Sequence, residues 1–99
     1  MCGIAGLMTA DGATPDAGVL DRLSDALAHR GPDGRGRHVA NGVGLIQTRL
    51  AIIDLETGDQ PIYAGDGPAA AIVANGEIYN YIELRADLPD VDFKTNSDC

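Results

Sequence analysis

The longest apolar-rich run of the sequence, Val43–Ile53, constrains the fold more than any other segment. Valine, leucine and isoleucine dominate this run, which predicts one or two β-strands buried on at least one face. The run is too short to cross a membrane, and the polar residues Gln47 and Thr48 interrupt it. Arg49 also lies inside it, and a buried arginine is costly unless its charge is paired. Arg49 is therefore either a member of an internal ion pair or the binder of a carboxylate, and the sequence leaves both interpretations open.

The segments around this run predict an α+β domain. Thr14-Pro15-Asp16 is typical of a helix start, because proline suits the first turn and aspartate suits the positive end of the helix. Apolar residues then recur at helical spacing until Gly31-Pro32, so we interpret the segment as an amphipathic helix that covers a sheet. The other predicted elements are strands at Ile4–Met8, Ala69–Ala74 and Val91–Thr95, a second helix from Asn80 to Pro89, a turn at Thr9–Gly12, and loops at Thr57–Pro61 and Ala64–Pro68.

A chain of 99 residues can form one small domain at most. Its net charge of -8 argues against nucleic acid or an anionic membrane as a partner. No signal peptide or membrane-spanning run is visible, which predicts a cytoplasmic protein. Cys2 and Cys99 are too few for a disulfide scaffold, so we interpret both as thiols. They match no usual metal-ligand spacing with His29 and His38, and we predict no metal site.

Cys2 is the candidate nucleophile of the chain. Removal of Met1 would leave a thiol and a free α-amine on the same residue. An α-amine titrates near pH ~8, so it can act as the general base of the thiol. Gly3 and Gly6 would leave room for a substrate beside that thiol. The alternative is an ordinary cysteine with no catalytic role.

Two further motifs each allow a structural and a functional interpretation. The segment Arg30-Gly31-Pro32-Asp33-Gly34 is a dense turn sequence, and the alternative is a substrate-side loop that places Arg30 and Asp33. Asn75-Gly76 between apolar runs is a strong β-hairpin signal. In the functional alternative, the Asn75 side-chain amide and the Gly76 backbone N–H point at one position and form an oxyanion hole.

Six motifs follow one another along the chain: Met1-Cys-Gly-Ile-Ala-Gly6, Arg30-Gly-Pro-Asp-Gly34, Thr48-Arg-Leu-Ala-Ile-Ile-Asp54, Gly58-Asp-Gln-Pro61, Asn75-Gly-Glu-Ile-Tyr-Asn80 and Thr95-Asn-Ser-Asp98. As a set they resemble the N-terminal glutaminase domain of glutamine-hydrolysing asparagine synthetases. That domain belongs to the class II glutamine amidotransferases, a group of N-terminal-nucleophile hydrolases. The resemblance covers the whole chain, and Pro32-Asp33 with the 49–54 segment favours the asparagine synthetase branch over its sister enzymes.

The resemblance implies a role for each residue of a glutamine site. Cys2 would be the nucleophile, with its α-amine as base and later as acid. Asn75 and Gly76 would form the oxyanion hole, and Arg49 would hold the glutamine α-carboxylate through paired N–H donors. Asp98 would take the α-ammonium. Glu77 and the backbone after Arg49 would assist, so the expected glutamine-binding residues are Arg49, Leu50, Ala51, Ile52, Ile53, Asn75, Gly76, Glu77 and Asp98.

The implied activity is hydrolysis of glutamine. Attack on its side-chain amide gives a γ-glutamyl thioester and releases ammonia, and water then frees glutamate. The family passes the ammonia to a synthetase domain that uses ATP and Mg²⁺ for asparagine synthesis, so this chain would need no cofactor of its own. The expected partners are glutamine and a synthetase domain or partner chain, with a homo-oligomer as an option. A non-catalytic glutamine-binding or interaction module is the alternative function, and a small hydrolase of another amide is a third.

The resemblance also implies a fold and its boundaries. The family domain is an N-terminal-nucleophile hydrolase αββα sandwich that is longer than this chain. We therefore expect residues 1–99 to be the N-terminal half of that sandwich, without the synthetase domain. The family more often has Gly-His where this chain has Ile46-Gln47, close to the expected glutamine site.

Overall fold

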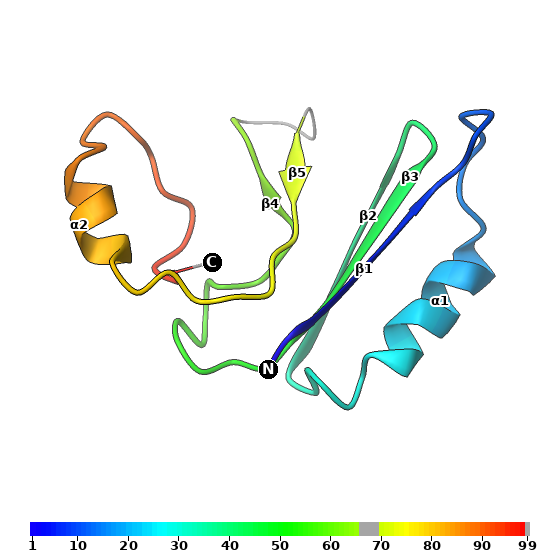
Figure 1. The fold of residues 1–99 in the computed structure, drawn as a ribbon, viewed down its shortest axis with the longest axis horizontal. Coiled ribbons are helices and arrows are strands. Elements are labelled where there is room, and N and C mark those ends of the chain that lie inside the picture. The colour runs from blue at the N-terminus through cyan, green and yellow to red at the C-terminus, as the bar shows by residue number, and fades with distance from the viewer. Residues whose placement is uncertain (66–69, 99) are drawn as a thin grey trace.

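The computed structural model describes residues 1–65 and 70–98 of the chain. The fold combines helices with small antiparallel sheets, in agreement with the α+β prediction. Residues 66–68 of the predicted loop Ala64–Pro68, the first residue of the predicted strand Ala69–Ala74 and the thiol of Cys99 lie outside the described residues. The elements are β1 (Gly3–Met8), α1 (Ala17–Ala26), β2 (Gly34–Ala40), β3 (Val43–Arg49), β4 (Ile62–Tyr63), β5 (Ala71–Ile72) and α2 (Tyr81–Ala86) (Figure 1).

The apolar run Val43–Ile53 supplies the central strand of the larger sheet. β3 pairs antiparallel with β1 on one side and with β2 on the other, which gives the strand order β1-β3-β2. The strand prediction is confirmed for the seven residues of β3, and the remainder of the run leaves the sheet as a loop. Gly3 lies opposite Thr48 in this register, so Cys2 and Arg49 come together at one end of the sheet.

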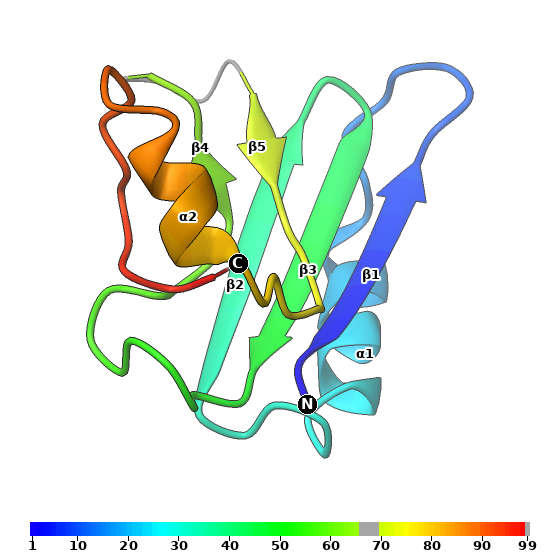
Figure 2. The ribbon, with the colours of Figure 1, turned by 60° about the vertical axis from the view of Figure 1, so that its left-hand side comes forward.

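The helix α1 covers one face of this sheet (Figure 2). Asp16 is its N-cap, and the carboxylate accepts a hydrogen bond of 3.0 Å from the Val19 N–H. Pro15 precedes the cap, so its predicted place in the first turn is wrong; aspartate takes the cap because its side chain can accept that bond. Leu20 is 1% exposed and packs on Gly44 of β3, where an added Cβ would lie 2.7 Å from the leucine Cδ2. The prediction of an amphipathic helix over a sheet is confirmed.

The strand β2 has no counterpart among the predicted elements, because its Gly-Arg-Gly-Arg-His sequence lacks an apolar pattern. It forms because β3 offers it a complete antiparallel ladder. Its arginines also face acidic residues of α1: Arg35 lies 2.7 Å from Asp25, and Arg37 pairs with Asp21. Exposed pairs of this kind contribute about 0–1 kcal/mol each. The strand therefore depends mainly on its backbone partners.

The opposite face of the sheet receives the segment that leads into β4. Gly36 of β2 lies under the Gln60 backbone, where an added Cβ would come 2.7 Å from the carbonyl carbon and closer still to its oxygen. Tyr63 of β4 contacts His38 of β2, with ring centroids 5.5 Å apart. The Gln60 Oε1 also accepts a hydrogen bond of 2.6 Å from the Ala74 N–H. This side chain therefore holds the segment after β5 close to the sheet.

Four predictions for the chain after β5 need correction. Asn75-Gly76 does not join two strands as a hairpin, since the chain continues into α2. The helix α2 ends at Ala86 rather than at Pro89, because proline disfavours helical backbone in the residue before it. Asn80 stands at the N-cap position without the expected side-chain capping bond. Residues 91–95 are irregular, because none of the described strands pairs with them in a ladder.

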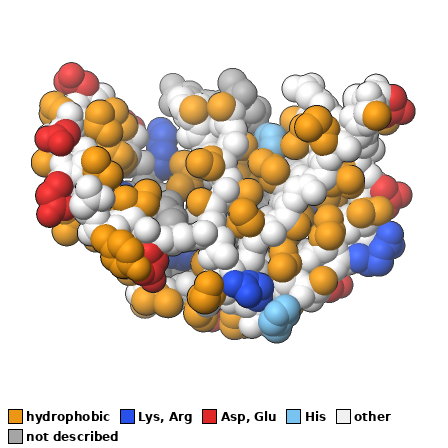
Figure 3. Space-filling model, viewed as in Figure 1, with side chains coloured by type: hydrophobic (Ala, Val, Ile, Leu, Met, Phe, Trp, Pro, Cys, Tyr) orange, Lys and Arg blue, Asp and Glu red, His pale blue; other side chains and the backbone are white. Residues whose placement is uncertain are grey.

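Apolar packing is concentrated between α1 and the sheet. Among the described residues, Leu20 and Ile46 are the two hydrophobic side chains that are fully buried. Many other large hydrophobic side chains are exposed, including Ile82 of α2 at 66% and Ile72 of β5 at 58%. Figure 3 shows such side chains, in orange, spread over the parts of the molecule formed by α2 and by β4 and β5. Across residues 1–65 and 70–98, none of the helices has the length and apolar character needed to span a bilayer.

Candidate functional site

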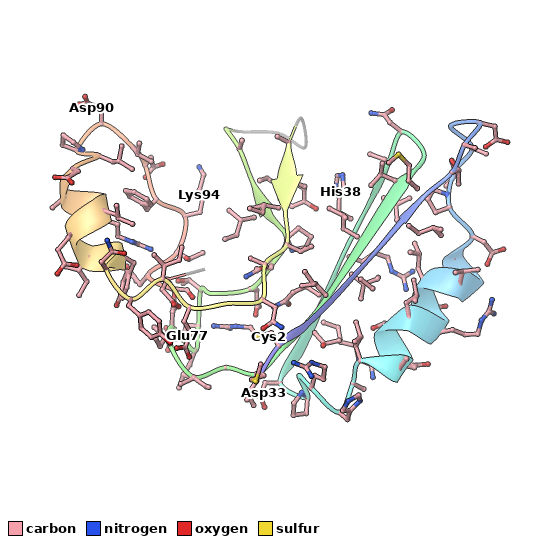
Figure 4. The ribbon with its side chains drawn as sticks, viewed as in Figure 1. Cys2, Asp33, His38, Glu77, Asp90 and Lys94 are labelled. Carbon is pink, nitrogen blue, oxygen red and sulfur yellow. The ribbon has the colours of Figure 1, made fainter. Side chains whose placement is uncertain are left out.

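A cavity of about 410 Å³ opens where the start of β1, the loop after β3 and the segments on either side of α2 meet. The molecule has two halves, one formed by α1 with the sheet of β1, β2 and β3, and the other by β4, β5 and α2. Figure 4 labels two residues that line the cavity, Cys2 and Glu77, near the junction between these halves. Of the residues that the sequence predicts for a glutamine site, Ala51 lies outside the lining. The predicted residues that line the cavity are Cys2, Arg49, Leu50, Ile52, Ile53, Asn75, Gly76, Glu77 and Asp98.

The Cys2 thiol is half-buried at the start of β1. The Leu50 N–H donates to its Sγ at 3.3 Å, and the Leu50 carbonyl oxygen lies 3.8 Å from the same sulfur. The Arg30 Nε donates to the Cys2 carbonyl oxygen at 3.1 Å. The next residue, Gly3, is packed so closely that an added Cβ would lie 2.9 Å from the Thr48 Oγ1. Both the side chain and the main chain of the candidate nucleophile are therefore fixed by neighbours.

The turn Arg30–Gly34 supports this site from outside the cavity. The Asp33 Oδ2 accepts a hydrogen bond of 2.9 Å from the Ala51 N–H, and Arg30 holds the main chain of Cys2. Neither charged side chain lines the cavity. The segment leads into β2, with Pro32 bridged to Arg49 and Gly34 as the first residue of the strand. Its charged residues contact the main chain of the site and do not line the cavity.

Arg49 ends β3 with its side chain only 7% exposed. Its Nη1 lies 3.0 Å from the Asp59 Oδ1, so the interpretation as an ion-pair member is confirmed. Its Nη2 donates to the carbonyl oxygen of Ile53 at 3.0 Å and to that of Asp54. Gly58 leaves room for the guanidinium, since an added Cβ there would lie 2.9 Å from the Arg49 Cζ. Arg49 also lines the cavity, and binding of a carboxylate by it stays a prediction.

Asp54 connects the loop after β3 with the C-terminal segment. Its backbone adopts a φ of 52°, a left-handed conformation that aspartate tolerates better than most residues. The carboxylate accepts the Thr57 N–H at 2.9 Å, the Thr57 hydroxyl, and the Asn96 N–H at 2.7 Å. The pKa of Asp54 falls from 3.8 to about 2. The hydrogen bonds from Thr57 are the main cause, and the Asn96 N–H and the Arg49 charge make smaller contributions in the same direction. Asp54 is therefore an anion throughout the physiological pH range.

Residues 75–77, which include the predicted oxyanion-hole pair, are exposed and line the cavity. Asp98, the predicted ammonium ligand, lines it as well. Its Oδ2 accepts a hydrogen bond of 2.8 Å from the Ile78 N–H. This bond connects the segment before α2 with the segment after it, so the two walls contributed by these segments are held together.

The side chain of Arg85 fixes the C-terminal segment from the side of α2. It donates to the Ser97 carbonyl oxygen at 2.6 Å. The guanidinium also lies over two aromatic rings, with its Cζ 4.6 Å from the centroid of Phe93 and 5.6 Å from that of Tyr81. Because Ser97 precedes Asp98, these contacts help to hold the backbone that carries the Asp98 carboxylate.

Two glutamines of the cavity wall were not among the predicted site residues. Gln47 is 1% exposed and Gln60 is 8% exposed, yet both line the cavity. Gln47 could have been found from strand periodicity, because it lies two positions before Arg49 and so shares its face of β3. Gln60 lies in the Gly58–Pro61 motif, but its contact with Ala74 depends on the tertiary fold.

The cavity thus brings together the Cys2 thiol, side-chain and backbone amides, the Arg49 guanidinium and the two carboxylates of Glu77 and Asp98. This combination fits a small molecule that carries both charges of an amino acid and a carbonyl group within reach of the thiol. Within the described part of the chain, histidine, cysteine and acidic side chains do not gather in a group of three or more that could hold a metal ion.

Comparison with known families identifies the class of domain. The whole chain, residues 1–99, matches the family model of the glutamine amidotransferase domain. The chain therefore belongs to the glutamine amidotransferase domain family, and the resemblance noted in its sequence is confirmed.

Its similar proteins are glutamine-hydrolyzing asparagine synthetases. The chain is 42% identical over 104 residues to asparagine synthetase 2 of Bacillus subtilis (strain 168) and 46% identical over 101 residues to the enzyme of Triphysaria versicolor. It is 43% identical over 100 residues to asparagine synthetase 2 of Oryza sativa subsp. japonica. Each alignment covers 100% of this chain but only 14% of the Bacillus protein and 17% of the two plant proteins. The chain thus spans less than a fifth of the length of these relatives.

Proposed function

We propose that Cys2 hydrolyses glutamine to glutamate and ammonia in the cavity at the start of β1. One observation carries this proposal: the thiol, the segment 75–77, the Arg49 guanidinium and the Asp98 carboxylate line a single cavity although they are far apart in the sequence. Membership of the glutamine amidotransferase domain family supports the same activity.

In the proposed reaction, loss of Met1 first gives Cys2 a free α-amine. Met1 is 72% exposed, which leaves it accessible to an aminopeptidase. The amine takes the thiol proton while Sγ attacks the side-chain amide carbon of glutamine. The C–N bond breaks, the amine returns the proton to the leaving nitrogen, and ammonia departs from a γ-glutamyl thioester. Water then attacks the thioester with the amine again as base, the proton passes to the sulfur, and glutamate leaves.

Asn75 and Gly76 are the proposed donors to the oxygen that becomes negative in the tetrahedral intermediate. A single donor of this kind accelerates acyl transfer by about 10²–10³-fold. The contacts of Cys2 with Leu50 and Arg30 support the proposal, because they hold the sulfur in one position relative to such donors.

Arg49 and Asp98 are the proposed ligands of the two charges of the amino acid. A guanidinium carries five N–H donors, and the three contacts of Arg49 with Asp59, Ile53 and Asp54 leave it able to bind a carboxylate as well. Asp98 would receive the α-ammonium, assisted by Glu77 and by the backbone of residues 50–53. These opposite charges favour glutamine over an amide that lacks an amino-acid end.

We further propose that the chain acts as the N-terminal half of an αββα sandwich within a longer cytoplasmic amidotransferase, as a monomer or a homo-oligomer. The similar proteins are asparagine synthetases several times longer than this chain, which supports transfer of the ammonia to a synthetase domain or partner chain. ATP and Mg²⁺ would be bound there, and aspartate or another carboxylate would accept the nitrogen. The exposed apolar side chains of α2 are consistent with further packing against such a protein.

The test is release of glutamate from glutamine by the purified chain, with Cys2→Ala as the control and intact mass to verify loss of Met1. Release that is abolished by Cys2→Ala is the expected result. Absence of release from chains that have lost Met1, together with glutamine binding detected by calorimetry, would favour a non-catalytic glutamine-binding module instead.

A further inference from the structure

Asp54 does not line the cavity and takes no part in the proposed reaction, yet three segments of the site converge on it. Its carbonyl oxygen accepts hydrogen bonds from the Arg49 Nη2 and, at 3.3 Å, from the Gly58 N–H. Its carboxylate accepts hydrogen bonds from Thr57 and Asn96. The main chain of Asp54 therefore contacts Arg49, whereas its side chain contacts the C-terminal segment at Asn96.

The first connection runs to the proposed α-carboxylate ligand. The Arg49 Nη2 donates to the carbonyl oxygens of both Ile53 and Asp54, so the orientation of the guanidinium depends on the turn at these residues. Asp54 adopts its φ of 52° within this turn. Its bonds to Thr57 close the turn, because they join the side chain to a residue three positions later.

The second connection runs to the proposed α-ammonium ligand. The Asp54 Oδ2 accepts the Asn96 N–H at 2.7 Å, across 42 positions of the sequence. Asp98 lies two residues further on and lines the cavity. A shift of the backbone at Asn96 would therefore move the Asp98 carboxylate.

We propose that Asp54 is a positioning residue that sets the separation between the ligands of the two charged groups of glutamine, Arg49 and Asp98. This inference rests on the proposed glutaminase function. Asp54 touches neither the substrate nor the reacting atoms, and it acts by joining the loop after β3 to the backbone at Asn96.

A carboxylate suits this role because it accepts hydrogen bonds on both oxygens. The depressed pKa of Asp54, about 2, keeps both oxygens available as acceptors at neutral pH. An asparagine has a single acceptor oxygen and an NH₂ group that only donates. The Thr57 N–H bonds to Oδ1, whereas the Thr57 hydroxyl and the Asn96 N–H share Oδ2. The single oxygen of an Asp54→Asn variant can therefore keep the Thr57 N–H or the Asn96 N–H, but not both, and one of the two connections is lost.

The test compares the full 99-residue chain with three variants, after circular dichroism has verified that each one is folded. Asp54→Asn leaves one acceptor oxygen where the carboxylate has two, and Asn96→Pro removes the Asn96 N–H donor while leaving Asp54 unchanged. Asp11→Asn is the matched control, because Asp11 also accepts one backbone N–H, that of Ala13 at 3.0 Å, but lies in an exposed turn away from the cavity.

We expect Asp54→Asn and Asn96→Pro each to raise the KM for glutamine about tenfold, the effect of losing one charged hydrogen bond, with kcat changed less than about threefold. Asp11→Asn should leave both constants unchanged. A second readout is the alkylation rate of Cys2, followed by peptide mass. The glutamine-shaped reagent 6-diazo-5-oxo-L-norleucine should label Asp54→Asn about tenfold more slowly than wild type, whereas iodoacetamide, which has no amino-acid end, should label both equally.

The two hypotheses fail in different ways. If the wild-type chain releases no glutamate and 6-diazo-5-oxo-L-norleucine shows no preference for Cys2, the proposed function is wrong, and the inference about Asp54 is wrong with it. The inference about Asp54 alone is wrong if the wild type is active and a folded Asp54→Asn or Asn96→Pro variant keeps the wild-type KM. It is also wrong if kcat and the rate of labelling by iodoacetamide fall as much as the KM rises, because the defect would then not be specific to the ligands of the two charges.

Discussion

The close approach of Gly36 to the Gln60 backbone gives the most direct test of how the two halves of the molecule are joined. In Gly36→Ala, the new methyl group would lie 2.7 Å from the Gln60 carbonyl carbon and 3.0 Å from the Pro61 Cδ, and closer still to the carbonyl oxygen. Nonbonded heavy atoms need about 3.5 Å, so the segment must move away from the sheet by roughly 1 Å or more. That movement would pull on the hydrogen bond between the Gln60 side chain and the Ala74 N–H.

The cost follows from these contacts. Overpacking of a tight site costs about 1–3 kcal/mol, and weakening the bond to Ala74 adds about 1 kcal/mol. We therefore expect Gly36→Ala to lower the free energy of unfolding by about 3 kcal/mol, which for a chain of this size lowers Tm by roughly 12–24 °C. Asn75 and Gly76 follow Ala74, so glutaminase activity should fall as well.

Gly6→Ala is the matched control, because Gly6 lies on β1 of the same sheet and an added Cβ would be 3.5 Å from the Leu45 Cδ2, an ordinary contact. This variant should be unchanged or more stable by about 0.5 kcal/mol, through the lower entropy of its unfolded chain. Urea unfolding followed by circular dichroism measures both free energies. Equal values for the two variants would refute the direct packing of Gln60 on the sheet.

Three further predictions concern charged side chains. Arg85→Met should lower the free energy of unfolding by about 1–2 kcal/mol in urea, because it loses the bond to the Ser97 carbonyl oxygen and the cation–π contact with Phe93. Asp54 has a folded-state pKa of about 2 and an unfolded-state pKa near 3.8, so its contribution to stability is complete above about pH 4 and is lost as the pH falls toward 2. Acid titration of the melting temperature should therefore be steeper for wild type than for Asp54→Asn in that range. Arg35→Ala should change stability by less than about 0.5 kcal/mol, since its pair with Asp25 is exposed, at 53% and 71% for the two side chains.

Each of these predictions has a result that would contradict it. Arg85→Lys keeps the charge but not the planar donor group, so its free energy of unfolding should lie between those of wild type and Arg85→Met. An Arg85→Met variant as stable as wild type would argue against a stabilising contact between Arg85 and Ser97. Parallel acid titrations of wild type and Asp54→Asn would mean that the Thr57 and Asn96 bonds do not perturb this carboxylate. A loss of more than about 1 kcal/mol in Arg35→Ala would show that β2 depends on its ion pairs.

The sequence predicts those elements whose apolar pattern is matched by local packing. β1 and β3 follow from runs of apolar residues and α1 from apolar residues at helical spacing, and all three are present. β2 could not be predicted in this way, because its partner β3 and not its own composition makes it a strand. Residues 91–95 show the converse: their composition favours a strand, but they pack through side chains such as Phe93 instead.

The candidate site divides in a similar way. Cys2 and Arg49 could be identified from residue type and position, and the register of β1 with β3 brings them together. The roles of Asp54 and Gln60 were not predictable, because each joins segments that are remote in the sequence. A hydrogen-bond acceptor of this kind has no periodic signal, and its partner is defined only by the folded chain.

The concentration of buried apolar side chains beside α1 has a consequence for motion. Amide hydrogens of β3 should exchange slowly with deuterium, because Ile46 and Leu20 are fully buried there, whereas those of α2, whose residues are all at least partly exposed, should exchange within seconds to minutes. The cavity lies on the border between these regions, with Cys2 on the protected side and Asp98 on the exchanging side. A ligand that contacts both sides of the cavity must therefore restrict the motion of α2 relative to the sheet. The entropy lost in this restriction lowers the affinity of the ligand. Slower exchange in α2 on addition of ligand would record this coupling directly.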